Sequence, residues 1–235
     1  MLDSQLLEDY MAVHWGYGNP GAGYWFVGVE QGGGGTFDEL QRRLDAWRGR
    51  GRREFEDLHE YHLAIGQDCW TRSSRPLLQS TWKQLVRTVL AANGQSATID
   101  SVRHYQSNDL GRQGGATCLV ELNPLPSPRT ATWQYGQWTS LPQLRDRHTY
   151  FAQVVPDRVL RLRQLIDRYA PQIVVFYGLE QKLQWERLVE QPFVIGRVEG
   201  FQVARRGPSR CFLVRHPSRA RNQLFESLGN AMRDA

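Results

Sequence analysis

The chain has 235 residues, a formal net charge of +5 and hydrophobic residues at 40% of its positions. This length fits one large α/β domain better than two small ones, and it allows a core that folds without disulfides or a structural metal. No stretch approaches the roughly 20 apolar residues that span a bilayer, and the acidic N-terminus lacks the basic region of a signal peptide. We therefore expect neither a membrane protein nor a secreted one.

The three cysteines, Cys69, Cys118 and Cys211, form no CxxC pair. A zinc site or a four-cysteine iron–sulfur cluster is therefore not expected. Two of the three lie in apolar runs that are typical of buried strands. This pattern favours reduced thiols in a cytoplasmic protein that holds no metal and no cofactor.

Arginine dominates the basic residues: Lys83 and Lys182 are the only lysines among 29. Because the guanidinium fork pairs bidentately with phosphate, an anionic partner such as DNA is plausible. Codon bias together with solvated surface arginines explains the same composition.

The first 15 residues predict a short amphipathic helix. The segment 15–23, WGYGNPGAG, predicts a flexible loop. Its glycines spell GxGxxG, but a dinucleotide fingerprint follows a strand and opens a helix. This one precedes the first strand, YWFVGVE at 24–30, whose near-continuous apolar run is typical of a buried parallel sheet.

The charged segment 37–63 predicts two solvated helices, which we interpret as an insertion. A stronger helix is predicted at 75–91, where apolar residues recur at helical spacing. TCLVEL at 117–122 predicts the second strand, and a proline-rich loop follows it to about residue 146.

Pro156 is expected to open the next helix, because proline is favoured at the first helical position, and Pro171 to end it. A third buried strand is predicted at 172–178, with another helix directly after it. The runs 201–205 and 210–215 predict a hairpin or two successive strands, and a final amphipathic helix runs to the C-terminus. Strands that alternate with helices predict one α/β domain over residues 1–235, with a parallel sheet covered on both faces.

Ligands bind such sheets at the carboxyl ends of the strands. The informative residues are therefore those that follow each strand: Glu30-Gln31-Gly32, Asn123-Pro124, Gly178 and His216-Pro217-Ser218. Glu30 stands beside four consecutive glycines, which let a ligand approach the backbone closely. A carboxylate repels phosphate but suits a site where positive charge develops or a water loses a proton. A turn cap or an arginine partner is the alternative role for Glu30.

The other strand exits also allow two interpretations each. The amide of Asn123 can donate and accept side by side, as recognition of the edge of a base requires, or it can stabilise the turn into Pro124. His216 can donate to a developing anion or serve as a turn residue. Ser218 can bind a phosphate, cap the last helix, or do both.

The order of these pieces resembles the uracil-DNA glycosylase superfamily. The first strand runs into GVEQG, the second into ELNPLPSP, the third ends as VVFYG, and the last leads into VRHPSRAR. The resemblance covers roughly residues 24–32 and 75–228. It implies a three-layer αβα sandwich with a central, mostly parallel four-stranded sheet.

The resemblance also assigns roles to single positions. Glu30 falls where some members carry the residue that handles water, and His216 where a histidine hydrogen-bonds the base as it becomes negative. Asn123 matches the asparagine that reads the uracil edge, and Ser218 matches a phosphate contact. The remaining implied contacts are Gly28, Gln31 and Gly32 to substrate and Arg219 and Arg221 to DNA.

The implied function is base excision in DNA repair, in which the enzyme hydrolyses the N-glycosidic bond of a flipped, deaminated base such as uracil. The sequence departs from the pattern at Gln31, where proline is usual, and at Leu77, where the stacking aromatic is expected. Phe37 or Trp70 is a candidate substitute for that aromatic. Two rival interpretations stay open: a non-catalytic relative that binds nucleic acid or a nucleotide, and an enzyme for another small substrate or a scaffold.

Overall fold

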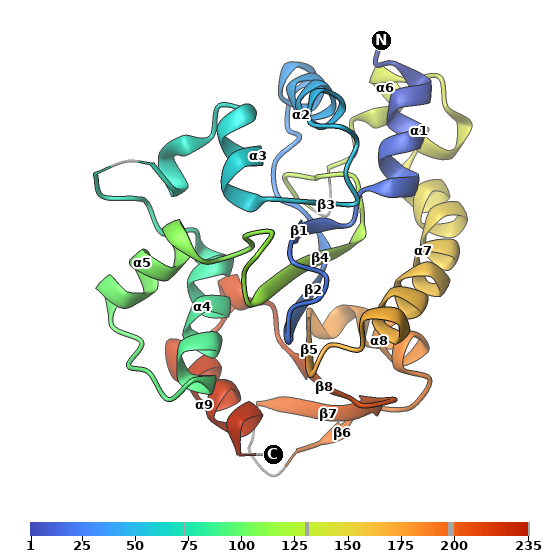
Figure 1. The fold of residues 1–235 in the computed structure, drawn as a ribbon. Coiled ribbons are helices and arrows are strands. Elements are labelled where there is room, and N and C mark those ends of the chain that lie inside the picture. The colour runs from blue at the N-terminus through green and yellow to red at the C-terminus, as the bar shows by residue number, and fades with distance from the viewer. Residues whose placement is uncertain (73, 130–131, 197–199, 235) are drawn as a thin grey trace.

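The computed structural model describes residues 1–72, 74–129, 132–196 and 200–234, with only the backbone described at Arg219. These residues form an α/β fold around an eight-stranded sheet, with strand order β3-β1-β4-β2-β5-β8-β7-β6 (Figure 1). The strands are β1 Gly16–Gly18, β2 Tyr24–Glu30, β3 Phe55–Glu56, β4 Thr117–Asn123, β5 Ile173–Tyr177, β6 Val194–Ile195, β7 Phe201–Arg206 and β8 Ser209–Val214.

The sheet is mixed. Its four middle strands, β4-β2-β5-β8, run parallel to their neighbours, whereas β1 is antiparallel to β4, and β7 is antiparallel to both β8 and β6. The α/β class is thus confirmed, but the sheet is larger than the four strands expected. The additional strands are β1, β3 and β6, which carry too few residues to show a period, and β7, which forms with β8 the hairpin that the runs 201–205 and 210–215 allowed.

The order of the strands in the sheet indicates where a ligand would bind. From β2 the chain moves to β4 on one side, and it later returns to β5 on the other side of β2. The strand order therefore reverses at β2, and open α/β sheets bind ligands at such a point, beyond the carboxyl ends of the strands.

Helices pack on both faces of the sheet (Figure 1). In β2, Trp25 and Val27 join a core with α7 and α8, and Phe26 joins a core with α2, α4 and α9. The α-helices of the described residues are α1 Ser4–Val13, α2 Phe37–Gly49, α3 Leu58–Ala64, α4 Ser80–Ala92, α5 Ile99–Asn108, α6 Tyr135–Trp138, α7 Arg147–Tyr169, α8 Lys182–Val189 and α9 Asn222–Arg233. The short 3-10 helices are η1 Asp68–Trp70, η2 Pro142–Leu144, η3 Leu179–Gln181 and η4 Pro217–Arg219.

Residues 37–63 contain two helices as predicted, but each helix buries one side instead of being solvated all round. Leu40, Leu44 and Trp47 of α2 are fully buried, as is Tyr61 of α3. Strand β3 lies between these helices and pairs with β1 at the edge of the sheet. The segment therefore belongs to the core.

The segment 15–23 is not simply a loop, since it contains β1. At Gly16 the backbone has φ +144°, and a Cβ there would lie 2.0 Å from the carbonyl oxygen of Leu119. A glycine is needed because the backbones of β1 and β4, which pair antiparallel, approach each other this closely. The sequence interpretation took these glycines as a sign of flexibility.

Two helix starts differ from the predictions, and α5 was not predicted. Helix α7 begins at Arg147, because the Asp146 side chain caps it by accepting the Thr149 N–H at 2.8 Å. Pro156 therefore lies inside the helix instead of opening it. Helix α4 begins at Ser80, where Gln79 accepts the Trp82 N–H at 2.7 Å. The predicted loop ends at about residue 146 as expected, but it contains α6 and η2, and its residues 130–131 lie outside the described residues.

Candidate functional site

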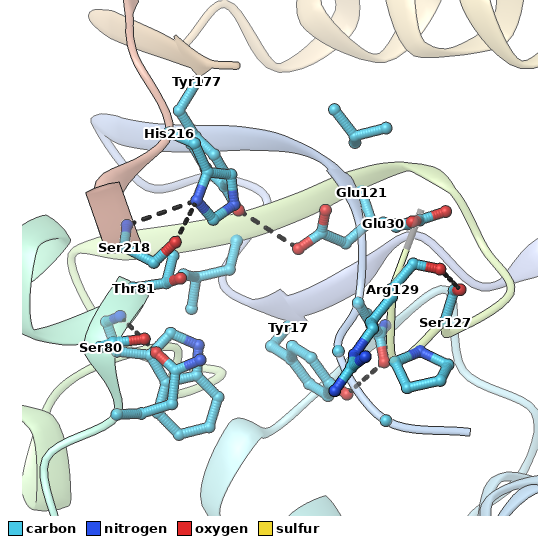
Figure 2. Close-up of a pocket in the computed structure, with 18 of the residues that line it drawn as sticks. Tyr17, Glu30, Ser80, Thr81, Glu121, Ser127, Arg129, Tyr177, His216 and Ser218 are labelled. Atoms are coloured by element: carbon cyan, nitrogen blue, oxygen red, sulfur yellow. Dashed lines mark hydrogen bonds between the residues drawn. The ribbon is translucent and has the colours of Figure 1, made fainter. Parts of the chain in front are cut away.

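A cavity of about 1100 Å³ opens at the carboxyl edge of the parallel strands (Figure 2). Its wall combines the ends of β2, β4 and β5 with the beginnings of α4 and α7 and with the turn between β8 and α9. Five of the residues predicted to form a site line it: Glu30, Gln31, Gly32, His216 and Ser218. Chain segments that are far apart in sequence therefore meet at the edge that the sheet topology indicates.

Glu30 ends β2 and is paired with an arginine. Its Oε2 accepts a hydrogen bond from Arg147 at 2.5 Å, and both side chains are largely buried. Burial raises the pKa of the Glu30 carboxyl and outweighs the opposing effect of Arg147. Arg147 also lies over the ring of Phe151 at 5.0 Å, which fixes its position. Arg147 was missed because the sequence interpretation started α7 nine residues too late.

A second carboxyl lines the cavity, at Glu121 of β4. Its Oε1 accepts a hydrogen bond from the Tyr177 hydroxyl at 3.3 Å, and its Oε2 has no partner among the described residues. Burial raises the pKa of Glu121 to about 8, and nearby Glu30 adds to the shift. Burial therefore favours the neutral form of the Glu121 carboxyl. An acid inside the apolar run TCLVEL was the signal for it in the sequence.

Gly28 makes the contact between Glu121 and Tyr177 possible. Gly28 pairs in register with Glu121, and a Cβ at Gly28 would lie 2.2 Å from the Tyr177 hydroxyl oxygen and 2.5 Å from Glu121 Oε2. The missing side chain leaves room for the tyrosine to reach across β2. Gly28 thus shapes the site without itself lining the cavity.

The oxygen and the nitrogen of the Gln31 amide each contact another side chain of the protein. Its oxygen accepts a hydrogen bond from the Tyr17 hydroxyl at 2.9 Å, and its nitrogen lies 3.0 Å from His14 Nε2. Burial lowers the pKa of His14 to about 3, so the neutral ring can accept from the amide. Gln31 therefore anchors the start of the glycine loop from inside.

Arg43 supports the glycines that follow. It donates to the Gly32 carbonyl at 3.3 Å and pairs with Glu39 at 3.1 Å. At Gly33 the backbone has φ +100°, and a Cβ would lie 2.5 Å from Arg43 and from Glu39. Gly33 is therefore required by the ion pair of Arg43 and Glu39 beneath the loop.

His216 lies in the turn after β8. Its Nδ1 accepts the Ser218 N–H at 3.3 Å and lies 2.8 Å from the Ser218 hydroxyl, and its ring meets Tyr177 edge-on at 5.6 Å. Because a ring nitrogen that accepts a hydrogen bond carries no proton, this contact favours the tautomer with the proton on Nε2. Figure 2 shows His216, Tyr177 and Glu121 in sequence along one wall.

Asn123 pairs with Glu30 in register but does not line the cavity. Its side chain is fully buried, and neither of its amide atoms has a partner among the described residues. Arg221 is exposed and also lies outside the cavity lining, whereas the side chain of Arg219 is outside the described residues. The structure therefore brings together Glu30 and His216 but leaves Asn123 behind the wall.

Aromatic rings form another part of the lining. Trp70 and Trp82 lie 6.2 Å apart, and Trp82 meets the ring of His62 at 5.1 Å. Leu77 is 58% exposed and does not line the cavity. Of the two candidate stacking residues, Trp70 lines the cavity and Phe37 does not.

No protein-family model matches the chain, and no curated protein matches it significantly. Within the described part of the chain, no three His, Cys, Asp or Glu side chains are grouped as metal ligands would be. None of the helices described has the length and apolar character needed to cross a membrane.

Proposed function

We propose that the chain is a DNA base-excision glycosylase of the uracil-DNA glycosylase superfamily, with the three-layer αβα fold of that superfamily. The observation that carries the proposal is that Glu30 and His216 line one cavity at the carboxyl edge of the parallel strands. The cavity volume of about 1100 Å³ accommodates a flipped nucleotide.

The two side chains suit the two ends of the bond to be hydrolysed. The Glu30 carboxylate, paired with Arg147, stabilises positive charge on the sugar and takes a proton from the attacking water. His216 Nε2–H donates to the base as the bond electrons move onto it. The atoms balance, since water supplies the hydroxyl to the sugar and a proton replaces the sugar on the base.

DNA would be held outside the cavity by charge. Arg129, at the cavity wall, and Arg221 are exposed cations on the side of the molecule where the strand passes in this proposal. The contact with His216 Nδ1 keeps the Ser218 hydroxyl beside the imidazole, close to where a flanking phosphate would lie. Binding by arginine–phosphate contacts weakens with salt, because each contact releases counterions.

Cleavage of oligonucleotides tests the function. We expect abasic product from at least one strand that contains uracil, hypoxanthine or xanthine. Glu30→Gln should slow the cleavage at least ~100-fold, because the amide cannot take a proton. Glu8→Gln, a change on the distant helix α1, is the matched control and should retain the wild-type rate. Folded protein that releases none of the three bases would refute the proposal.

The Glu30–Arg147 ion pair favours a second candidate, a non-catalytic nucleic-acid-binding relative. An acid held by an arginine can serve to fix α7 against the sheet instead of acting on a substrate. This candidate predicts salt-dependent DNA binding that survives Glu30→Ala, with no base release from any substrate.

A further inference from the structure

Trp70, in the short helix η1, lines the cavity without belonging to a hydrophobic core. Seven of the eight tryptophans of the chain lie in one of the two cores or pack against one. Trp70 does neither among the described residues, and its side chain is partly exposed. A large ring that contributes to no core, at the wall of a cavity, is typical of a surface that contacts a ligand.

The ring of Trp70 keeps a face for such a ligand. It meets the ring of Trp82 with the two planes 73° apart, and Trp82 packs against the core. This edge-to-face contact covers at most one face of the Trp70 ring. The indole nitrogens of Trp25, Trp47 and Trp185 donate to backbone carbonyls, whereas that of Trp70 has no hydrogen-bond partner among the described residues.

A buried glutamine fixes the backbone that carries Trp70. The side chain of Gln106, a residue 1% exposed, donates to the carbonyl of Trp70 at 3.2 Å and to that of Leu77 at 2.8 Å. Its oxygen accepts the Gln79 N–H at 3.0 Å. One side chain of α5 therefore ties η1 to the start of α4. A ring on a fixed backbone loses little conformational entropy when a ligand stacks on it.

Trp70 lies nearer to the mouth of the cavity than to its buried end. The lining residues Tyr17 and Glu121 are buried, whereas Trp70 is partly exposed. In the same segment as Trp70, Arg72 and Arg75 are exposed. An aromatic ring beside exposed cations suits single-stranded nucleic acid, because a base stacks on the ring while arginines meet the phosphates.

The cavity has room for more than the flipped nucleotide. A pocket for one drug-sized ligand measures ~300–1000 Å³, whereas this cavity measures about 1100 Å³. Figure 2 shows Ser80 and Thr81, at the start of α4, on the opposite side of the cavity from Glu30. Trp82, which contacts Trp70, follows them in the chain. A nucleotide whose sugar lies at Glu30 therefore leaves the tryptophan side for the next nucleotide of the strand.

Resting on the proposed function, which makes DNA the ligand, we propose that Trp70 stacks the base beside the flipped nucleotide and that the substrate is single-stranded DNA. In a duplex the neighbouring base stays paired, and other bases cover both of its faces. In a single strand that base leaves the stack at little cost and lies on the indole ring. Arg72 and Arg75 then pair with phosphates of the same strand.

Fluorescence anisotropy with short labelled oligonucleotides that contain no damaged base tests this proposal. Wild-type protein should bind the single strand at least ~10-fold more tightly than the duplex of the same sequence. Trp70→Leu keeps apolar bulk beside Trp82 but has no aromatic face, and it should weaken single-strand binding at least ~5-fold. Trp70→Phe keeps an aromatic face and should stay within ~3-fold of the wild type. Neither variant should change duplex binding.

Ile195→Ala, which removes an exposed apolar side chain on the edge strand β6, is the control and should bind like the wild type. Thermal unfolding confirms that each variant is folded. Equal affinity for single strand and duplex, or wild-type affinity in Trp70→Leu, would overturn this subsite, and base release would still decide the glycosylase proposal separately.

Two further outcomes separate the subsite from the chemistry. Single-strand binding that depends on Trp70, with no release of uracil, hypoxanthine or xanthine, would support the subsite and refute the glycosylase. A Trp70→Leu variant that binds the undamaged strand normally but releases the damaged base more slowly would place Trp70 against the flipped base itself, and would overturn the proposal.

Discussion

At the scale of single residues, the site depends on two carboxyls in different environments. Glu30 has a cationic partner in Arg147, while Glu121 has a neutral one in Tyr177. Buried carboxyls whose environments differ in this way divide into a base and an acid at neutral pH. The sequence places both acids on strands, but it does not show which partner each will meet.

Arg147→Ala tests the partner of Glu30. Without the guanidinium the pKa of Glu30 rises further, because only burial then acts on it. The acid side of the pH–rate profile should therefore move to higher pH, with activity at neutral pH reduced. Arg145→Ala, two residues away on the surface, should leave the profile in place. An unchanged profile in Arg147→Ala would argue against Glu30 as the base.

Gly28→Ala tests the space beneath Tyr177. The new methyl group would overlap the tyrosine hydroxyl and the Glu121 carboxyl, so we expect a loss of about 1–3 kcal/mol in the free energy of unfolding. At Gly32 no atom lies within 4 Å of the position that a Cβ would take, and Gly32→Ala is the matched control for stability. Equal unfolding free energies for the two variants, measured in urea, would contradict this account.

At the scale of elements, a buried arginine anchors helix α7 to the sheet alongside the apolar residues that α7 contributes to the core. Arg158 donates to the carbonyls of Leu122 and Glu121 at 2.9 Å and of His14 at 3.1 Å. Its guanidinium carbon lies 3.3 Å from the ring centre of Trp15. Burial lowers the pKa of Arg158 to about 9, yet the surrounding carbonyl oxygens satisfy its donors. Arg147, which contacts Glu30, lies at the start of the same helix.

Arg158→Met should therefore destabilise the fold strongly. The methionine keeps the apolar stem but leaves several buried carbonyls unpaired, and we expect a loss of about 3–5 kcal/mol in the free energy of unfolding. Arg161→Ala, one turn further along α7, removes an exposed arginine and should cost less than about 1 kcal/mol. Chemical denaturation compares the two, and similar losses would show that Arg158 is not the anchor.

At the scale of the whole molecule, buried titratable groups make stability depend on pH. Folding keeps His14 and His62 neutral, with pKa values lowered to about 3 and about 4 from 6.5. Below pH 6.5 the unfolded chain binds protons that the folded chain does not, so stability falls as the pH falls. Glu121 acts in the opposite direction. Its pKa is raised to about 8 from 4.5, so the folded chain holds the extra proton and stability falls as the pH rises towards 8.

These opposing effects predict a maximum in the free energy of unfolding near pH 6.5. On each side the free energy should fall by up to about 1.4 kcal/mol per pH unit for each proton by which the folded and unfolded chains differ. Urea denaturation at a series of pH values measures the curve. Glu121→Gln should flatten the fall above pH 6.5 and steepen the acid side between about pH 4.5 and pH 6.5, where Glu121 opposes the two histidines. A Glu121→Gln curve that still falls between pH 6.5 and pH 8 would assign that fall to another group.

The parallel strands and the places where they end could be predicted from the amino-acid sequence. Apolar runs at 24–30, 117–122 and 172–178 are long enough to show burial, and the polar residues after each run indicated the edge where the cavity lies. The short strands β1 and β3 and the early start of α7 were not predicted. Two or three residues show no period, and a capping aspartate is a weaker signal than a proline.

Which side chains reach the cavity depends on the packing of the folded chain. Register places Glu30 opposite Asn123 and Gly28 opposite Glu121, but the packing around each pair leaves Asn123 buried behind the wall and Glu121 at its surface. The contacts of Arg147 with Glu30 and of Tyr177 with Glu121 join residues 117 and 56 positions apart. Contacts over such separations depend on how α7 and β5 dock against β2 and β4, and no local pattern in the chain encodes that docking.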